Sequence, residues 1–242
     1  GGLYGRLTDE IKVYPFTLKE CEDYFDHENI ELSRYDIVQS YMVFGGIPYY
    51  LSYFRKGYSF ERNTDMILFG NRPRLKDEFN RLFKAIFTNA EDCKKIIRLL
   101  AKRNYGFTRE EIAKATGLPL GGGLSDTLTA LAESDFILRY SPYGKGTCEY
   151  YKLIDNFCLF WLKHVEPNQE NASYFNDHCT SDIMKAWKGV AFEQVCWQHI
   201  PQIKRALEIG GVKSSVSAWN IAGTETKTGV QVDLLINRND NI

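Results

Sequence analysis

Three short predicted helices followed by a predicted hairpin, between residues 92 and 155, constrain the fold of this chain more than any other feature. Apolar residues recur at helical spacing over residues 93–103, 108–117 and 124–134. Two runs rich in strand-forming residues follow at 136–140 and 148–153, and the segment that joins them contains Pro and Gly. This order is typical of a winged helix-turn-helix.

The preceding part of the chain, residues 17–90, is predicted to be helical throughout. Two capping boxes, Thr17 with Glu20 and Ser33 with Asp36, indicate where helices begin. The many aromatic residues of this region are better explained by a packed helical core than by a surface for stacking bases. Residues 12–16, just before it, are predicted to form a strand. The fold class predicted from these patterns is mainly α, with an α+β part at the C-terminal end.

Composition narrows the class of protein. The chain has 242 residues, of which 44% are hydrophobic, so it can bury a sizeable core as one large domain or a few small ones. Its net charge of -1 gives no global attraction to nucleic acid or to acidic membranes. The six cysteines show no C-x-x-C pair, so we expect reduced residues in a cytoplasmic protein. No apolar run is long enough for a membrane span, and no membrane partner is expected.

The predicted winged helix has two possible roles. Its third helix, where a DNA-binding protein reads bases, carries no Arg, Lys, Asn or Gln over residues 121–135. Cations elsewhere in the unit could hold DNA phosphates without reading sequence, although a solvated basic face explains them equally well. These candidate DNA-binding residues are Lys94, Lys95, Arg98, Lys102, Arg103, Arg139 and Lys145. Packing against a protein or another domain is therefore favoured over DNA binding for this unit.

The last stretch, residues 189–242, holds the only arrangement that could assemble a metal-dependent site. Glu193 lies in a predicted helix, and Asp233 lies in the apolar strand predicted over residues 230–236. A carboxylate in such a strand costs free energy unless it binds something. With a further acid and a lysine, the two would form a Mg²⁺ site that activates water on a phosphodiester. The alternative is that Asp233 only caps or pairs with a neighbour such as Lys227 or Arg238.

Several segments, taken in order, resemble the archaeal-type AAA+ ATPases, which join an ATPase core to a winged helix and a C-terminal PD-(D/E)xK nuclease-like domain. The segments that carry this resemblance are Leu-Tyr-Gly-Arg at 3–6, Tyr-Pro-Phe-Thr-Leu-Lys-Glu at 14–20, Val-Phe-Gly-Gly-Ile-Pro-Tyr-Tyr-Leu at 43–51, Ala-Phe-Glu at 191–193 and Gln-Val-Asp at 231–233. The resemblance covers essentially the whole chain.

The resemblance implies a division of the chain. Residues 1–16 would end the ATPase core, 17–90 would form the helical lid, 91–166 the winged helix, and 167–242 a truncated restriction-endonuclease-like α/β unit. Arg6 resembles a phosphate-sensing arginine, and Glu193 and Asp233 match the family's catalytic, metal-binding acids. The P-loop, the Walker B segment and the E-x-K strand are not in the sequence, so by itself this region is expected neither to hydrolyse ATP nor to cleave DNA. ATP and Mg²⁺ would be cofactors of the full-length parent.

Two hypotheses about function follow. In the first, the parent is an ATP-driven machine acting on nucleic acid, with Glu193 and Asp233 as Mg²⁺ ligands. In the second, the winged helix and the nuclease-like unit are interaction modules for a protein partner or for self-association, and ATP controls partner binding. The near-neutral charge and the third helix without basic residues favour the second hypothesis for this region.

Overall fold

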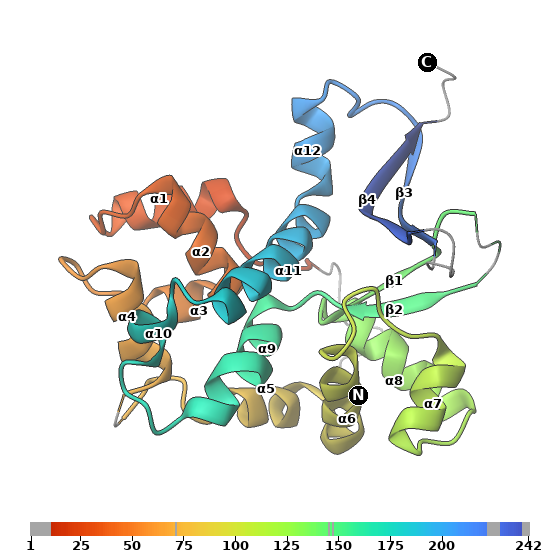
Figure 1. Ribbon diagram of the computed structural model, residues 1–242, viewed down its shortest axis with the longest axis horizontal. Helices are drawn as coiled ribbons and strands as arrows, with labels where there is room; N and C mark the ends of the chain where they lie inside the picture. The colour runs from red at the N-terminus through yellow and green to blue at the C-terminus, as the bar shows by residue number, and fades with distance from the viewer. Residues whose placement is uncertain (1–10, 71, 145, 147, 222–227, 239–242) are drawn as a thin grey trace.

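The computed structural model describes residues 11–70, 72–144, 146, 148–221 and 228–238 (Figure 1). It is mainly helical with two small antiparallel sheets, as the sequence predicts for the fold class. The helices are α1 (Leu18–His27), α2 (Arg34–Phe44), α3 (Pro48–Leu51), α4 (Phe60–Leu68), α5 (Glu78–Ile86), α6 (Ala90–Leu100), α7 (Arg109–Thr116), α8 (Gly122–Glu133), α9 (Asn156–Phe160), η1 (Trp161–Val165), η2 (Glu166–Asn168), α10 (Tyr174–His178), α11 (Asp182–Gln198) and α12 (Ile200–Ala206). The strands are β1 (Ile137–Tyr140), β2 (Tyr150–Leu153), β3 (Ser214–Ile221) and β4 (Val230–Arg238).

The N-terminal helices begin where the sequence predicts. The capping boxes at Thr17 and Ser33 are both present. Each hydroxyl accepts a hydrogen bond from the backbone N–H three residues later, and the carboxylate of that later residue accepts one from the backbone N–H of Thr17 or Ser33. The turn after α2 depends on Gly46, which has a φ of 68°. A Cβ there would lie 2.4 Å from the Phe16 carbonyl oxygen, so only glycine fits this turn.

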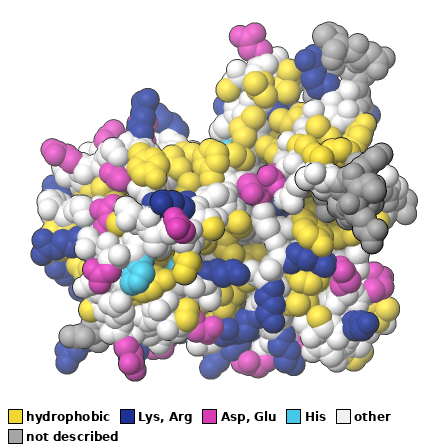
Figure 2. All heavy atoms as spheres, viewed as in Figure 1, with side chains coloured by type: hydrophobic (Ala, Val, Ile, Leu, Met, Phe, Trp, Pro, Cys, Tyr) yellow, Lys and Arg dark blue, Asp and Glu magenta, His cyan; other side chains and the backbone are white. Residues whose placement is uncertain are grey.

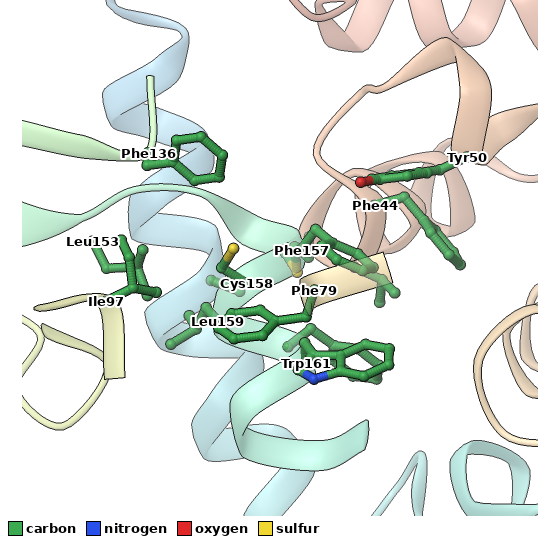
Figure 3. Close-up of a cluster of buried hydrophobic side chains, with 14 of the residues drawn as sticks. Phe44, Tyr50, Phe79, Ile97, Phe136, Leu153, Phe157, Cys158, Leu159 and Trp161 are labelled. Atoms are coloured by element: carbon green, nitrogen blue, oxygen red, sulfur yellow. The ribbon is translucent and has the colours of Figure 1, made fainter. Parts of the chain in front are cut away.

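A helix from later in the chain completes this N-terminal bundle. Helix α9 and the π-helical turn η1 carry Phe157 and Trp161, both buried. Phe157 packs on Tyr50 at a ring distance of 4.7 Å, and Trp161 stacks on Phe79 at 6.3 Å. Figure 3 shows these rings in one cluster with Ile97 of α6, Leu153 of β2 and Phe136, the residue before β1. The hydrophobic core is therefore continuous from the N-terminal helices into the segment α6–β2.

The segment from α6 to β2 has the predicted order of three helices and a hairpin. Strand β1 pairs with β2 in antiparallel register, with Arg139 opposite Tyr151. The turn between α6 and α7 lies against β2, where Phe107 forms an isolated bridge with Tyr151. Gly106 in this turn has a φ of 84°, and a Cβ on it would lie 2.1 Å from the Tyr151 carbonyl oxygen. This close approach fixes β2 against the end of α6.

One expectation about local structure is wrong, and one short helix is not predicted. The described part of the predicted N-terminal strand, residues 12–16, has no regular structure. Its Lys12 instead pairs with Asp135 at 2.8 Å, and the Phe16 N–H donates to the Gly46 carbonyl oxygen. The polar segment 167–182, for which the sequence patterns predict no helix, contains α10. Phe175 of this helix is buried against Phe60 and Phe160, and the Asp65 carboxylate accepts from the backbone N–H of Phe175 at 2.8 Å.

The long helix α11 crosses the centre of the molecule, between the N-terminal helices and the β1–β2 hairpin (Figure 1). Two glutamines attach it to the end of β2: Gln194 donates to the Leu153 carbonyl oxygen and Gln198 to the Ile154 carbonyl oxygen, both at 2.9 Å. Beyond it, β3 and β4 form an antiparallel pair with an irregularity between Ser217 and Trp219. The sequence predicts β4 but not its partner β3. None of the helices in the described ranges is long and apolar enough to span a bilayer.

Candidate functional site

The two acids singled out in the sequence, Glu193 and Asp233, meet at one small cavity. Glu193 comes from the middle of α11 and Asp233 from β4, and both side chains line the cavity together with Lys152 of β2. The cavity has a volume of about 20 Å³, which holds roughly one water molecule or one monatomic ion. The structure thus brings together the two acids that the sequence singles out as a possible metal site.

Glu193 is held by an amide and is partly desolvated. The Asn104 Nδ2 group, at the end of the α6–α7 turn, donates a hydrogen bond to Glu193 Oε2. Burial raises the pKa of Glu193 above its usual value, and the nearby Asp233 carboxylate raises that pKa further, while Asn104 and Lys152 oppose the shift. The ionised carboxylate is therefore disfavoured in this cavity unless a cation or a further donor reaches it.

Asp233 is oriented from its own strand. Gln231, two residues earlier and so on the same face of β4, donates from Nε2 to Asp233 Oδ1. The backbone carbonyl oxygen of Asp233 accepts from Trp197 Nε1 at 3.1 Å, which joins β4 to α11. The alternative partner Lys227 lies outside the described residues. Asp233 thus has a fixed carboxylate that points to the same cavity as Glu193.

Lys152 is the charged residue of this cavity that sequence reasoning missed. Its side chain is only 2% exposed, and its ammonium group lies 5.4 Å from the centre of the Trp197 ring. Burial lowers the pKa of Lys152, and the Glu193 and Asp233 carboxylates oppose that decrease. Within the described ranges, no carboxylate oxygen lies within 4.0 Å of the ammonium nitrogen. The sequence feature that could have pointed to Lys152 is the position of a lysine within the aromatic and apolar strand at residues 150–153.

The oxygen atoms around the cavity fit a hard divalent cation. Carboxylate and amide oxygens are the protein ligands of Mg²⁺, which keeps several waters as well. Besides the two carboxylates, the Asn104 Oδ1 atom is buried and has no hydrogen-bond partner. No group of three or more His, Cys, Asp or Glu side chains in the described part of the chain could hold a metal. Glu193, Asp233 and Asn104 could therefore hold such an ion only with water or a phosphate completing its coordination.

Aromatic rings form the remaining walls. Tyr105, Tyr140, Tyr150 and Trp219 surround the charged groups. The Tyr140 hydroxyl donates to the Tyr105 carbonyl oxygen at 2.6 Å, and burial raises the pKa of Tyr140, so it stays a neutral donor. These walls limit the entry of bulk water, which strengthens the electrostatic interactions inside.

The predicted DNA-binding cations do not join this cavity. Each one that the structure describes, apart from Lys102, is paired with a carboxylate of its own chain. The pairs are Lys94 with Glu91 at 2.7 Å, Lys95 with Asp92 at 3.0 Å, Arg98 with Glu166 at 2.5 and 2.6 Å, Arg103 with Glu111 at 2.5 and 3.1 Å, and Arg139 with Glu149 at 2.8 Å. Arg6 and Lys145 lie outside the described residues. A DNA phosphate would have to compete with these carboxylates.

Comparison of the chain with protein-family models, with curated proteins and with solved structures found no match in any of the three.

Proposed function

We propose that this chain is the C-terminal region of an archaeal-type AAA+ ATPase, and that Glu193 and Asp233 form a divalent-cation site that acts on nucleic-acid phosphates. The observation that carries the proposal is the meeting of these two acids with Lys152 at one cavity, from three separate segments. Two carboxylates and a lysine are the set expected for a PD-(D/E)xK-type site. In this proposal the lysine comes from β2 of the winged-helix-like segment.

Each residue has a role in this proposal. Glu193 and Asp233 bind the cation, while Asn104 and Gln231 hold the two carboxylates in place through the hydrogen bonds described above. A bound Mg²⁺ would polarise a phosphoryl oxygen and make water a better nucleophile. The Lys152 ammonium supplies a positive charge for a phosphate oxygen. Because the raised pKa of Glu193 favours its protonated form, we expect cation binding to weaken as the pH falls.

A Mn²⁺ titration followed by calorimetry tests the cation site. The comparison is between the unaltered chain, Asp233→Ala, and a control, Asp126→Ala, which removes an exposed carboxylate of α8. We expect a roughly tenfold or greater loss of affinity in Asp233→Ala only, since removal of a ligand typically has effects of that order or more. Equal affinity in all three proteins would exclude the cation site.

A second function, an interaction module for a protein partner, is favoured by a separate observation. Five of the predicted phosphate-binding cations are paired internally, and α8 carries no basic residue. Binding of duplex DNA at low salt distinguishes the two functions, because phosphate contacts are strongest there. DNA binding that falls steeply with salt supports the nucleic-acid function, whereas no binding even at low salt supports the interaction module.

A further inference from the structure

A second, larger pocket lies between α6, α9, η1 and α11, and Asn104 lines both this pocket and the small cavity. Its volume is about 440 Å³, within the roughly 300–1,000 Å³ typical of small-molecule sites. Most of its wall is aliphatic, from Leu100, Leu153, Leu159, Ile183 and Val190. Figure 2 shows hydrophobic side chains interspersed with Lys and Arg side chains over the region where Figure 1 places α9 and α11. The pocket thus suits an aliphatic chain better than a nucleotide, whose many polar groups would lack partners.

Two lysines supply the charge of this pocket. Lys102 and Lys163 are exposed, and no carboxylate side chain lines the pocket beside them. In the part of the chain that the structure describes, neither lysine forms an ion pair, in contrast to the five paired cations of the α6–β2 segment. The pocket therefore carries two positive charges that are available to an anion.

Buried polar atoms in the wall also lack partners. Trp187 Nε1, His164 Nε2 and Gln194 Oε1 have no hydrogen-bond partner, although their side chains are only 7%, 2% and 1% exposed. Burial lowers the pKa of His164 to about 4, so its ring is neutral at pH 7. Such unsatisfied groups are uncommon in a folded protein and call for an explanation, such as a ligand or water. Because these atoms are enclosed, a ligand reaches them after a small rotation of the side chains.

We propose that this pocket binds a small aliphatic carboxylate, with its hydrocarbon chain against the aliphatic wall and its carboxylate between Lys102 and Lys163. The volume favours a small molecule over a protein helix, and the two unpaired lysines favour an anion over a neutral lipid. Rotation of Trp187 toward the pocket lets its indole N–H donate to the ligand. This site goes beyond the cation site of Glu193 and Asp233 and does not depend on it.

Octanoate and its neutral counterpart 1-octanol, titrated into the whole chain by calorimetry and by NMR of the Trp187 indole N–H, test the proposal. We expect saturable octanoate binding that shifts the Trp187 signal, with 1-octanol binding about tenfold more weakly. The double variant Lys102→Gln/Lys163→Gln should lose about tenfold in octanoate affinity and none in 1-octanol affinity. The matched control Lys76→Gln/Lys114→Gln removes two exposed lysines that do not line the pocket and should bind as the unaltered chain does.

Ile183→Glu gives an independent check that does not endanger folding, because Ile183 is 74% exposed on α11. A carboxylate at this position of the wall should abolish octanoate binding and leave Mn²⁺ binding unchanged. Three results would overturn the proposal: no saturable octanoate binding, equal binding of octanoate and 1-octanol, or full octanoate affinity in the double lysine variant. None of these results bears on the cation site, so the two proposals fail separately.

Discussion

The small cavity of Glu193 and Asp233 and the larger pocket of Lys102 and Lys163 are both lined by α11, and their chemistry is opposite. The cavity of Glu193 and Asp233 is about 20 Å³ and is lined by these two partly buried acids and the buried Lys152, whereas the pocket lined by Lys102 and Lys163 is about 440 Å³ and mostly aliphatic. Glu193 and Gln194 are consecutive residues of α11. Glu193 lines the small cavity, Gln194 lines the larger pocket, and Asn104 lines both. A site the size of one ion therefore adjoins a site the size of a small organic molecule, and one helix contributes side chains to both.

The difference shows how burial decides what a charged side chain can do. In the small cavity, Lys152 is buried and Glu193 is partly buried, so burial lowers the pKa of Lys152 and raises the pKa of Glu193. In the larger pocket, the two lysines are exposed to water and form no ion pair with any described residue. The following predictions test this contrast, from the largest expected effect to the smallest.

Gly106→Ala should have the largest effect, because it disturbs β2. This strand supplies Lys152 to the small cavity and Leu153 to the larger pocket. The new Cβ would lie 2.1 Å from the Tyr151 carbonyl oxygen, so the free energy of unfolding should fall by about 3 kcal/mol or more. Urea denaturation measures the change. The control Gly117→Ala also has positive φ, but its Cβ meets nothing within 4 Å, and we expect it to cost only about 1–2 kcal/mol. Equal losses would mean that the contact with Tyr151 relaxes.

Lys152→Met should strengthen Mn²⁺ binding, because it removes a positive charge that opposes the cation beside Glu193 and Asp233. We expect about a tenfold increase in affinity, equivalent to about 1.4 kcal/mol. Lys163→Met, in the larger pocket, should leave the Mn²⁺ affinity unchanged. Calorimetry measures the Mn²⁺ affinity of both variants. Weaker binding in Lys152→Met would show instead that the lysine supports the geometry of the acids.

Arg98→Gln should lower the free energy of unfolding by about 1 kcal/mol, while Lys163→Gln should change it by less than about 0.5 kcal/mol. Arg98 donates two hydrogen bonds to Glu166 and lies 5.3 Å from the centre of the Phe79 ring, whereas Lys163 forms no ion pair with any described residue. Urea denaturation of both variants at the same salt concentration measures the contrast. Equal losses would contradict the division between structural cations and cations available to a ligand.

Glu193→Gln should give the smallest change, a slight stabilisation at neutral pH. Burial raises the pKa of Glu193 above its usual value of 4.5, so the folded state binds this proton more tightly than the unfolded state does. Its contribution to stability is therefore present below about pH 4.5 and is lost as the pH rises through the folded-state pKa. Urea midpoints of both proteins at about pH 4 and pH 7 should differ more at pH 7. A variant that is less stable at pH 7 than the unaltered chain would contradict this sign.

Local signals in the sequence predict much of this fold. Thr17 and Ser33 each form the expected capping box, and Thr108 forms a third, because the bonds that define such a box lie within four consecutive residues. The hairpin β1–β2 and the strand β4 follow from short runs of apolar and β-branched residues for the same reason. Residues 12–16 show the limit, since strand-forming residues there find no neighbouring strand to pair with and bind Asp135 and Gly46 instead.

The chain by itself determined that Glu193 lies on a helix and Asp233 on a strand, because periodicity and apolar spacing are local properties. Only the tertiary structure decided that Lys152 joins them and that Lys102 and Lys163 line a pocket. These residues come from segments far apart in the sequence, and their meeting depends on the packing of α11 against β2 through Gln194 and Gln198. The same packing decides which charges are buried, and so which pKa values shift and which cations remain available to a ligand.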